Sequence, residues 1–385
     1  MIGRGPAITY LADYVNGYGF TGDDLEGERL PVVRIQHLLD PSVPMDYTDR
    51  SVPNVAIESG DLVFSWSATL ATRMWDRGPA LLNQHLFRVD PRQGVDRHWL
   101  KYVLDAACET LEGHMHGSAM THITRDMMRR VRVVLPPLEK QRAIADYLDT
   151  ETARIDALTT KKRRMIELLD ERFRGRIEAA YAPWDRVPLK RLVAWREGPG
   201  IMAEDFRDSG VPLIRVRGVG GETVSLEGCN YLDPSQVAAR WAHFRLLPSD
   251  YVISASASMG IVSQVDEVAA GAVPYTGLII IRPRGSTSME FVRWFLQSDE
   301  FIRQVDQLKT GTAIQHYGPT HLDQISAPAP PNSAQEHLGM ELLRARRQTD
   351  KLRSLLEQQL ATLSEHRRAL ITAAVTGELE IPAAA

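Results

Sequence analysis

The sequence has few cysteines and no long apolar run. Only Cys108 and Cys229 occur in 385 residues, far apart and without nearby metal-ligand partners, so neither a disulfide framework nor a zinc site is expected. No stretch of about eighteen apolar residues exists, which argues against a transmembrane helix. The first residues, MIGRGPAITY, lack the basic segment and apolar core of a secretory signal. We therefore expect a cytoplasmic protein.

Motifs of common enzymes that process nucleotides and nucleic acids are also missing. There is no GxxxxGK[ST] phosphate loop, and no GxGxxG follows a strand-like segment. Neither Pro-Pro pair has the Asn/Asp-Pro-Pro-aromatic setting of an amino-methyltransferase. None of the lysines has an Asp or Glu two positions before it, as common metal-dependent nucleases do. The sequence predicts a binding protein with no catalytic residues and no metal or cofactor of its own.

Lysine is scarce relative to arginine. Seven of the 45 basic residues are lysines, and the net charge is −4. Arginine suits phosphates and guanine edges because its guanidinium donates two parallel hydrogen bonds, although a GC-rich genome is the simpler explanation of the bias. The acidic balance weighs mildly against nucleic-acid binding, but a local basic surface is sufficient for it.

The chain repeats itself once. LPVVRI at 30–35 matches VPLIRV 181 residues later, and ESGDLVFS at 58–65 matches LPSDYVIS 189 residues later. HWLKYVL at 98–104 matches EFVRWFL at a spacing of 192, and GSAMTHI at 117–123 matches GTAIQHY at 194. A spacing that drifts in one direction is typical of a diverged duplication with small insertions.

Each half has the same order of parts. A mixed region of strand-like runs ends at a Pro-Pro pair, and about forty proline-free residues with strong helix formers follow, at 139–181 and 333–375. Apolar residues recur near a 3-4 spacing in both stretches, which predicts a coiled-coil seam. The alternative is two ordinary amphipathic helices, each packed on its own domain. The seam residues expected are Leu148, Ile155, Leu158, Met165, Leu169, Leu342, Ala345, Thr349, Leu352, Leu356, Leu363 and Leu370.

These motifs resemble the specificity subunits of type I restriction-modification systems. The resemblance is carried by the PPLxxQ entry to the first helix, its degenerate form PPNSAQ at the second, and the closing AAVTGEL. The Gly-Ser and Gly-Thr turns at 117–118 and 311–312 also fit. The second entry departs from the usual motif because it lacks leucine at its third position.

The resemblance implies a mixed α/β (α+β) fold with an internal pseudo-two-fold repeat. Two globular target-recognition domains are joined by two long antiparallel helices that form a coiled coil. The domain ranges expected are 1–135 and 183–329 for the recognition domains, 136–182 and 330–378 for the spacer helices, and 379–385 for a C-terminal tail.

The resemblance also implies a function in phage defence. Each recognition domain is expected to read one half of a split, asymmetric site in double-stranded DNA. Two methyltransferase subunits would dock on the helices and methylate adenine with S-adenosylmethionine, and motor-nuclease subunits would supply restriction with ATP and Mg²⁺. This chain would be non-catalytic, with no membrane partner.

Arginines, amides and aromatic residues beside Gly-Pro or Gly-Ser turns are the candidates for DNA contact. In the first half the candidates are Arg73, Trp75, Arg77, Asn83, Gln84, His85, Ser118, Thr121 and His122. In the second half they are Arg215, Arg217, Ser256, Ser258, Tyr275, Thr276, Lys309, Thr312, Gln315 and His316. Structural roles stay open for several: Trp75 as a core residue, and Arg34 and Arg215 as ion-pair partners.

A further set of residues is assigned to the spacer and to partner docking. It comprises Pro136, Pro137, Gln141, Leu148, Ile155, Leu158, Leu169, Pro330, Pro331, Gln335, Leu342, Leu352, Leu356 and Leu363.

Three other interpretations remain at this point. The chain could be the recognition module of another phage-defence complex, a coiled-coil adaptor that no longer reads DNA, or a single-chain methyltransferase or nuclease with unrecognised motifs. The partners distinguish the first, DNA binding the second, and S-adenosylmethionine binding by the chain alone the third.

Overall fold

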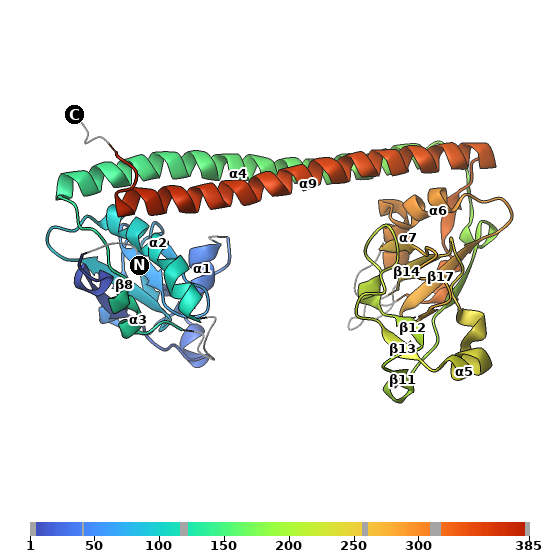
Figure 1. The fold of residues 1–385 in the computed structure, drawn as a ribbon, viewed down its shortest axis with the longest axis horizontal. Coiled ribbons are helices and arrows are strands. Elements are labelled where there is room, and N and C mark those ends of the chain that lie inside the picture. The colour runs from blue at the N-terminus through green and yellow to red at the C-terminus, as the bar shows by residue number, and fades with distance from the viewer. Residues whose placement is uncertain (1–4, 41, 116–121, 256–260, 309–316, 382–385) are drawn as a thin grey trace. The chain divides into compact units, whose positions relative to one another are not determined.

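The computed structural model describes residues 5–40, 42–115, 122–255, 261–308 and 317–381. They form two compact units. Unit 1 comprises Met1–Lys162 with Glu357–Ala385, and unit 2 comprises Arg163–Leu356. Each unit therefore contains one half of each long helix, because the first helix, α4, spans Leu138–Tyr181 and the second, α9, spans Asn332–Thr376 (Figure 1).

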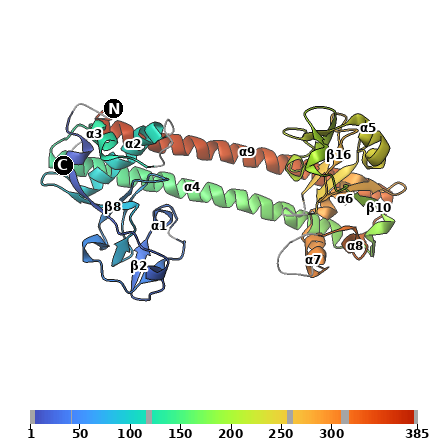
Figure 2. The same cartoon turned by 90° about the horizontal axis from the view of Figure 1, so that it is seen from below.

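Unit 1 contains two four-stranded sheets. One is antiparallel, with the strand order β1 (Ala12–Asn16), β8 (Leu86–Pro91), β5 (Leu62–Ser65) and β6 (Thr72–Met74). The other has the order β3 (Asp46–Thr48), β2 (Leu30–Val33), β7 (Ala80–Leu82) and β4 (Ala56–Ile57), and β2 pairs with β7 in parallel. Figure 2 shows β2 and β8, which belong to these two sheets. The helices of this unit's globular part are α1 (Ile35–Leu39), α2 (Arg97–Met115) and α3 (Arg125–Arg130).

Unit 2 repeats this plan. Its antiparallel sheet has the order β10 (Val193–Glu197), β17 (Leu278–Pro283), β14 (Tyr251–Ser254) and β15 (Val262–Gln264). Its mixed sheet has the order β11 (Phe206–Arg207), β13 (Asn230–Leu232), β12 (Val211–Ile214) and β16 (Val273–Pro274), with β12 and β16 parallel. A short pair, β9 (Arg186–Pro188) and β18 (Ser326–Pro328), and the helices α5 (Pro234–Gln236), α6 (Met289–Leu296), α7 (Asp299–Leu308) and α8 (Pro319–Leu322) complete it.

Burial explains why the matched segments ESGDLVFS and LPSDYVIS, which contain β5 and β14, are mostly apolar within their strands. All four residues of β5 and all four of β14 are buried, so these strands read as continuous apolar runs rather than as alternating ones. The two strands hold the same place in their sheets. The predicted fold class, a duplicated mixed fold with two long helices, is therefore confirmed.

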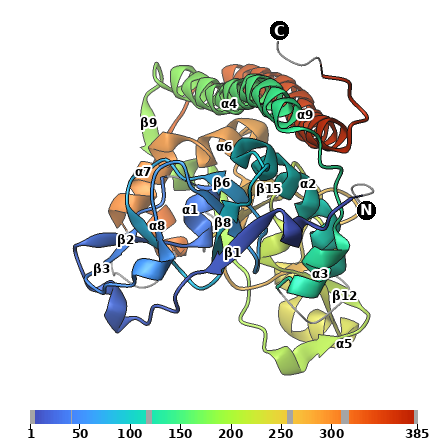
Figure 3. The same cartoon turned by 90° about the vertical axis from the view of Figure 1, so that its left-hand side faces the viewer.

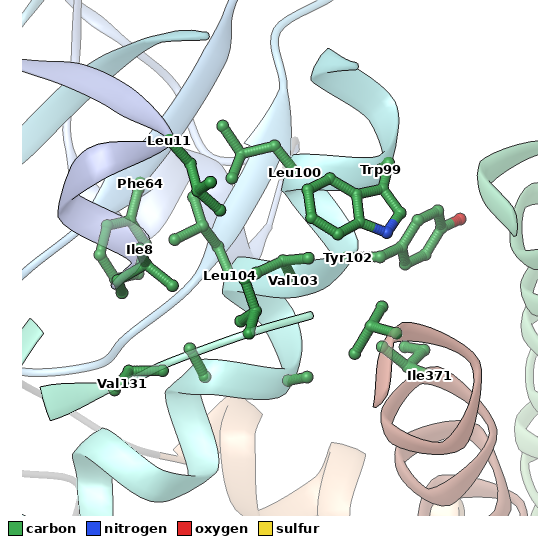
Figure 4. Close-up of a cluster of buried hydrophobic side chains, with 14 of the residues drawn as sticks. Ile8, Leu11, Phe64, Trp99, Leu100, Tyr102, Val103, Leu104, Val131 and Ile371 are labelled. Atoms are coloured by element: carbon green, nitrogen blue, oxygen red, sulfur yellow. The ribbon is translucent and has the colours of Figure 1, made fainter. Parts of the chain in front are cut away.

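Each globular part packs on the long helices through one helix. In unit 1, α2 lies between the β8 sheet and the two long helices (Figure 3). Trp99 and Tyr102 of α2 are buried with Ile371 of α9 (Figure 4). Leu148 of α4 belongs to the same buried cluster. In unit 2, Phe291 and Phe295 of α6 pack in the same way with α4 and α9, through Phe173, Ile177 and Leu342.

Within each unit the two long helices run antiparallel, and their seam is partly polar. In unit 1, Lys162 Nζ donates to Gln359 Oε1 (2.5 Å) and Arg367 pairs with Asp156 (3.4 Å). In unit 2, Arg353 Nη1 donates to Asp170 Oδ2 (3.0 Å). Polar seam contacts of this kind fix the register of paired helices at some expense of stability.

The predicted phase of the seam was wrong in part. Leu148, Ile155, Leu342 and Leu356 are buried, and Leu169 and Leu363 are half-buried. Leu158, Met165 and Leu352 instead face solvent, with 47%, 51% and 43% of their surface exposed. Along α4, the residues that face the seam after Ile155 are the half-buried Thr159, four residues later, and Lys162. A four-residue step there turns the apolar side chains at 158 and 165 outward.

In each unit, one glutamine joins the globular part to the long helix that follows it in the sequence. Gln141 is fully buried; its Oε1 accepts a hydrogen bond from Asp96 N (2.7 Å), and its Nε2 donates to Gly94 O (2.9 Å) and Pro136 O (2.8 Å). Gln335 does the same in unit 2, accepting from Ser288 N (3.1 Å) and donating to Pro330 O (2.9 Å). We call these two sets of contacts the glutamine clamps.

The clamps explain the repeated Pro-Pro-x-x-x-Gln spacing. The side chains of Asp96 and Ser288 accept hydrogen bonds from the first turns of α2 and α6, so each glutamine ties a helix start to a helix entry. The assignment of Gln141 and Gln335 to partner docking is therefore corrected, because both side chains are buried within the chain. Pro137 and Pro331 are exposed and Pro330 is buried. Within the described residues, no helix is long and apolar enough to cross a membrane.

We predict that Gln141→Ala lowers the free energy of unfolding by about 3 kcal/mol, because it leaves buried backbone groups without partners. Calorimetric unfolding of the full chain measures this. The matched control is Lys140→Ala, which removes an exposed neighbour on the same helix turn and is expected to leave the transition in place. Equal effects of the two substitutions would contradict the clamp.

Candidate nucleic-acid interface

The same backbone frame occurs at the ends of both sheets in each unit. In unit 1, Gly17 follows β1 and donates to Leu86 O (2.9 Å), while Asn83 N donates to Val33 O (3.0 Å). In unit 2, Gly198 donates to Leu278 O (2.8 Å), and Tyr275 N donates to Ile214 O (2.9 Å). Asn83 and Tyr275 therefore occupy the same position in the two units.

Glycine is required where this frame is tightest. A Cβ at Gly17 would lie 2.1 Å from Asn83 O, and one at Gly198 would lie 2.4 Å from Tyr275 O. Both distances are far inside van der Waals contact, with backbone as the obstacle. The backbone at Asn83 thus lies directly against Gly17, which follows β1, and the backbone at Tyr275 lies directly against Gly198, which follows β10. These backbone contacts fix where the Asn83 and Tyr275 side chains begin.

A third loop joins the frame in each unit. Trp66 N donates to His85 O (3.2 Å), and Ile123 N donates to Trp66 O (2.9 Å). In unit 2, Ala255 N donates to Gly277 O (2.9 Å) and Tyr317 N to Ala255 O (3.1 Å). We call the surface around Gly17, Trp66 and Asn83 the frame surface of unit 1. The surface around Gly198, Ala255 and Tyr275 is the frame surface of unit 2.

One arginine pair is common to both frame surfaces. Arg34 forms an ion pair with Asp46 (3.1 Å), and Arg215 Nη1 donates to Asn230 Oδ1 at the same distance. Asp46 and Asn230 open the equivalent strands β3 and β13. A contact repeated in two units that differ in surface sequence supports the structural role left open for Arg34 and Arg215. Arg215 also lies over the Tyr275 ring, 4.6 Å from its centroid.

The remaining side chains differ between the two frame surfaces. Unit 1 presents Trp66 with the rings of His85 and His122 at 5.6 and 6.0 Å, and the Trp66 indole donates to Asn16 Oδ1 (3.1 Å). Unit 2 has Ala255 and Gly277 at the positions of Trp66 and His85. There, Arg215, Val216, Arg217, Asn230, Tyr275 and Thr276 line a hollow of about 490 Å³.

The comparisons with known proteins agree with this duplicated plan. The family model for the type I restriction modification DNA specificity domain matches residues 20–168. The type I restriction enzyme MjaVIII specificity subunit of Methanocaldococcus jannaschii is 20% identical over 381 residues, covering 93% of this chain and 88% of the relative. The chain is therefore similar to type I restriction-modification specificity subunits, over residues 20–168 by the family model and over most of its length by this relative.

Two further similarities extend this result. The EcoBI specificity subunit of Escherichia coli is 22% identical over 173 residues, which cover 44% of this chain and 36% of that protein. A chain from a structural study of complex assembly and conformational transition of the type I R-M system superposes with a TM-score of 0.73 and 16% identity, covering 97% of both chains. At this identity, the superposition shows a shared fold.

Within this family fold, the predicted contact residues fall into distinct groups. Asn83, Gln84 and His85 lie together on the frame surface of unit 1, with His122 beside them. Arg215, Arg217, Tyr275 and Thr276 lie together in unit 2. Eight candidates lie outside the described residues: Ser118, Thr121, Ser256, Ser258, Lys309, Thr312, Gln315 and His316.

The other first-half candidates face inward. Trp75 is 1% exposed and donates to Gly78 O (2.6 Å), so its assignment to DNA contact is corrected: it is a core residue. Arg77 lies over the Trp75 ring and donates to His37 O (3.3 Å), and Arg73 donates to Leu38 O (3.4 Å). These half-buried arginines hold the end of α1.

Sequence reasoning missed Trp66 and Gln36. Trp66 lies just beyond the matched segments ESGDLVFS and LPSDYVIS, where the alignment sets it against Ala255. Gln36 is exposed two residues after Arg34, as Arg217 is after Arg215. In both places, a residue that differs between the two halves stands next to a segment that matches, and this difference was the signal available in the sequence. No cluster of three or more His, Cys, Asp or Glu that could hold a metal ion occurs within the described residues.

His37 is a buried histidine that contacts the backbone of Arg34 at the first frame surface. Its Nδ1 accepts from Arg34 N (2.9 Å) and its Nε2 lies 3.1 Å from Pro44 O, so Nε2 carries the hydrogen of the neutral ring. Burial lowers the pKa of His37 below its usual value, and the nearby Arg77 and Arg34 lower it further. Protonation of Nδ1 would remove the hydrogen bond that orders Arg34.

We therefore predict a loss of stability in acid. Because the folded pKa lies below the unfolded one, the contribution of His37 is complete above about pH 6.5 and decreases as the pH falls towards the folded pKa. Urea unfolding at about pH 7.5 and pH 5.5 should show a smaller decrease for His37→Gln than for the wild type. The exposed His243→Gln is the control; if both variants keep the wild-type decrease, His37 is not its source.

Proposed function

We propose that the chain reads a split, asymmetric DNA sequence, with one half-site recognised by the frame surface of each unit. One observation carries this proposal: the two units share a backbone frame down to its hydrogen bonds, yet present different side chains on it. A common frame docks in a common way on duplex DNA, while different side chains read different base edges. The resulting site is bipartite and need not be palindromic.

The side chains on the two surfaces suit base readout. Amides such as Asn83 and Gln84 donate and accept in the pattern that adenine presents in the major groove, and arginine fits guanine. Trp66 and the two histidines beside it offer flat faces and ring nitrogens. The net charge of −4 is compatible with this function because the recognition surfaces are local.

We infer that the chemistry resides in partner subunits. Methyltransferase subunits would use S-adenosylmethionine to methylate adenine, and motor-nuclease subunits would use ATP and Mg²⁺ for restriction. This chain would determine the DNA sequence at which they act. The outward apolar side chains of α4, Leu158, Met165 and Leu168, recur on one helix face and support docking there. Similarity to specificity subunits along most of the chain disfavours a module of another defence complex or an adaptor that does not read DNA.

The first test is methylome sequencing of a methylation-free host that expresses the chain with its neighbouring methyltransferase subunit. We expect a bipartite adenine-methylated motif that requires both proteins. Asn83→Ala is expected to relax one half-site and Tyr275→Ala the other, by roughly tenfold in discrimination at one base pair. In each variant the other half-site is the internal control. A pair of variants that relaxed both halves equally would contradict separate reading.

The helices provide a second test. Inserting one heptad into each helix, after Lys162 and after Leu356, preserves the seam register and adds about 10 Å of helix. We expect the gap between half-sites to grow by about three base pairs, since DNA rises about 3.4 Å per step, with both half-sites unchanged. An unaltered gap in a complex that still methylates DNA would show that the helices do not set the spacing.

A further inference from the structure

Arg217 differs from Arg215, the other arginine that lines the unit 2 hollow. Arg215 is held by Asn230 and lies over the Tyr275 ring, so its guanidinium is committed to the frame. Arg217 is exposed at the hollow's rim. Within the described part of the chain, no hydrogen bond or ion pair engages its guanidinium.

Gly228 places the Arg217 guanidinium. A Cβ on Gly228 would lie 2.8 Å from Arg217 Nη2 and 3.1 Å from its Cζ, and Gly228 itself has a φ of +60°. The guanidinium therefore lies against bare backbone at a turn that favours glycine. This support limits the directions in which the group can move without using any of its donors. An arginine held in this way loses little freedom when it binds a ligand.

The corresponding position of unit 1 carries a different exposed side chain. Gln36 stands two residues after Arg34, as Arg217 stands two residues after Arg215. The paired arginine is common to both units, whereas the exposed side chain that follows it is not. The position after the shared pair is therefore where the chemistry of the two frame surfaces diverges.

We infer that the unit 2 hollow is a guanine-binding site, in which Arg217 donates two hydrogen bonds to O6 and N7 of one guanine in the major groove. Guanine is the base whose exposed edge offers two adjacent acceptors that match the guanidinium fork. The neighbouring Tyr275 and Thr276 bound the hollow and complete its polar and apolar wall. This inference rests on the proposed function and assigns one base of the second half-site.

A contact with a backbone phosphate is the competing role for Arg217. It would weaken binding to all sequences equally, whereas a guanine contact weakens binding only to the cognate base. The two roles are separated by measuring affinity for cognate and substituted duplexes with the same complex.

The experiment uses the full chain assembled with its methyltransferase subunit and a duplex carrying the motif found by methylome sequencing. Each guanine of the half-site relaxed by Tyr275→Ala is replaced in turn by 7-deazaguanine, which lacks N7, or by hypoxanthine, which keeps N7 and O6. We expect one position where 7-deazaguanine weakens wild-type binding by roughly tenfold or more and hypoxanthine has a much smaller effect.

The variants then assign the contact. Arg217→Ala should bind the native and 7-deazaguanine duplexes equally, and Arg217→Lys, which keeps the charge but not the fork, should also lose most of the discrimination. Arg303→Ala, which removes an exposed arginine on α7 that does not line the hollow, should behave as the wild type. Both Arg217 variants should still methylate motifs with the first half-site intact.

Three results would overturn the inference. They are a second half-site without guanine, a 7-deazaguanine penalty that persists in Arg217→Ala, and a loss of affinity in Arg217→Ala that is the same for every sequence. The proposed function fails by a different result: a wild-type complex that methylates no bipartite motif at all.

Discussion

Two buried amides determine how this chain is built. Gln141 and Gln335 each accept from the backbone N–H of the residue just before a packing helix and donate to a proline carbonyl at the entry to a long helix. An amide is suited to this because it accepts and donates at once, and neither end of the contact can be left unsatisfied inside a core. The clamps fix where each globular part begins relative to its own helices, and the frame surfaces are positioned through the sheets that α2 and α6 cover.

The repeat then separates structural residues from candidate readers without any alignment of relatives. Contacts present in both units, such as Arg34 with Asp46 and Arg215 with Asn230, preserve the frame. Side chains present in only one unit, such as Trp66 or Arg217, stand at positions where the other unit builds the same frame with a different residue. An internal duplication thus serves as its own control, since both copies solved the same folding problem and diverged in what they bind.

The fold was largely predictable because its signals are local and repeated. Forty-residue helices, Pro-Pro entries and four ordered matches are readable along the chain. The seam phase was not, because half-buried Thr159 lies at the seam where an apolar repeat places its neighbour Leu158. Nor was the fate of Trp75, since a tryptophan among arginines reads the same whether its ring is buried or exposed. The frame surface depends on hydrogen bonds between β2 and β7, strands about fifty residues apart, and no local motif encodes their meeting.

The glycines at 17 and 198 have a consequence for how such a protein diversifies. The turn at Asn83 and Tyr275 is held by contact between its backbone and a glycine, so its path does not depend on which side chain stands there. An asparagine and a tyrosine are accommodated there on one unchanged scaffold. Substitutions at this position can accordingly alter what the surface presents while the backbone frame stays in place, so that the lineage can change what it recognises without first rebuilding how it folds.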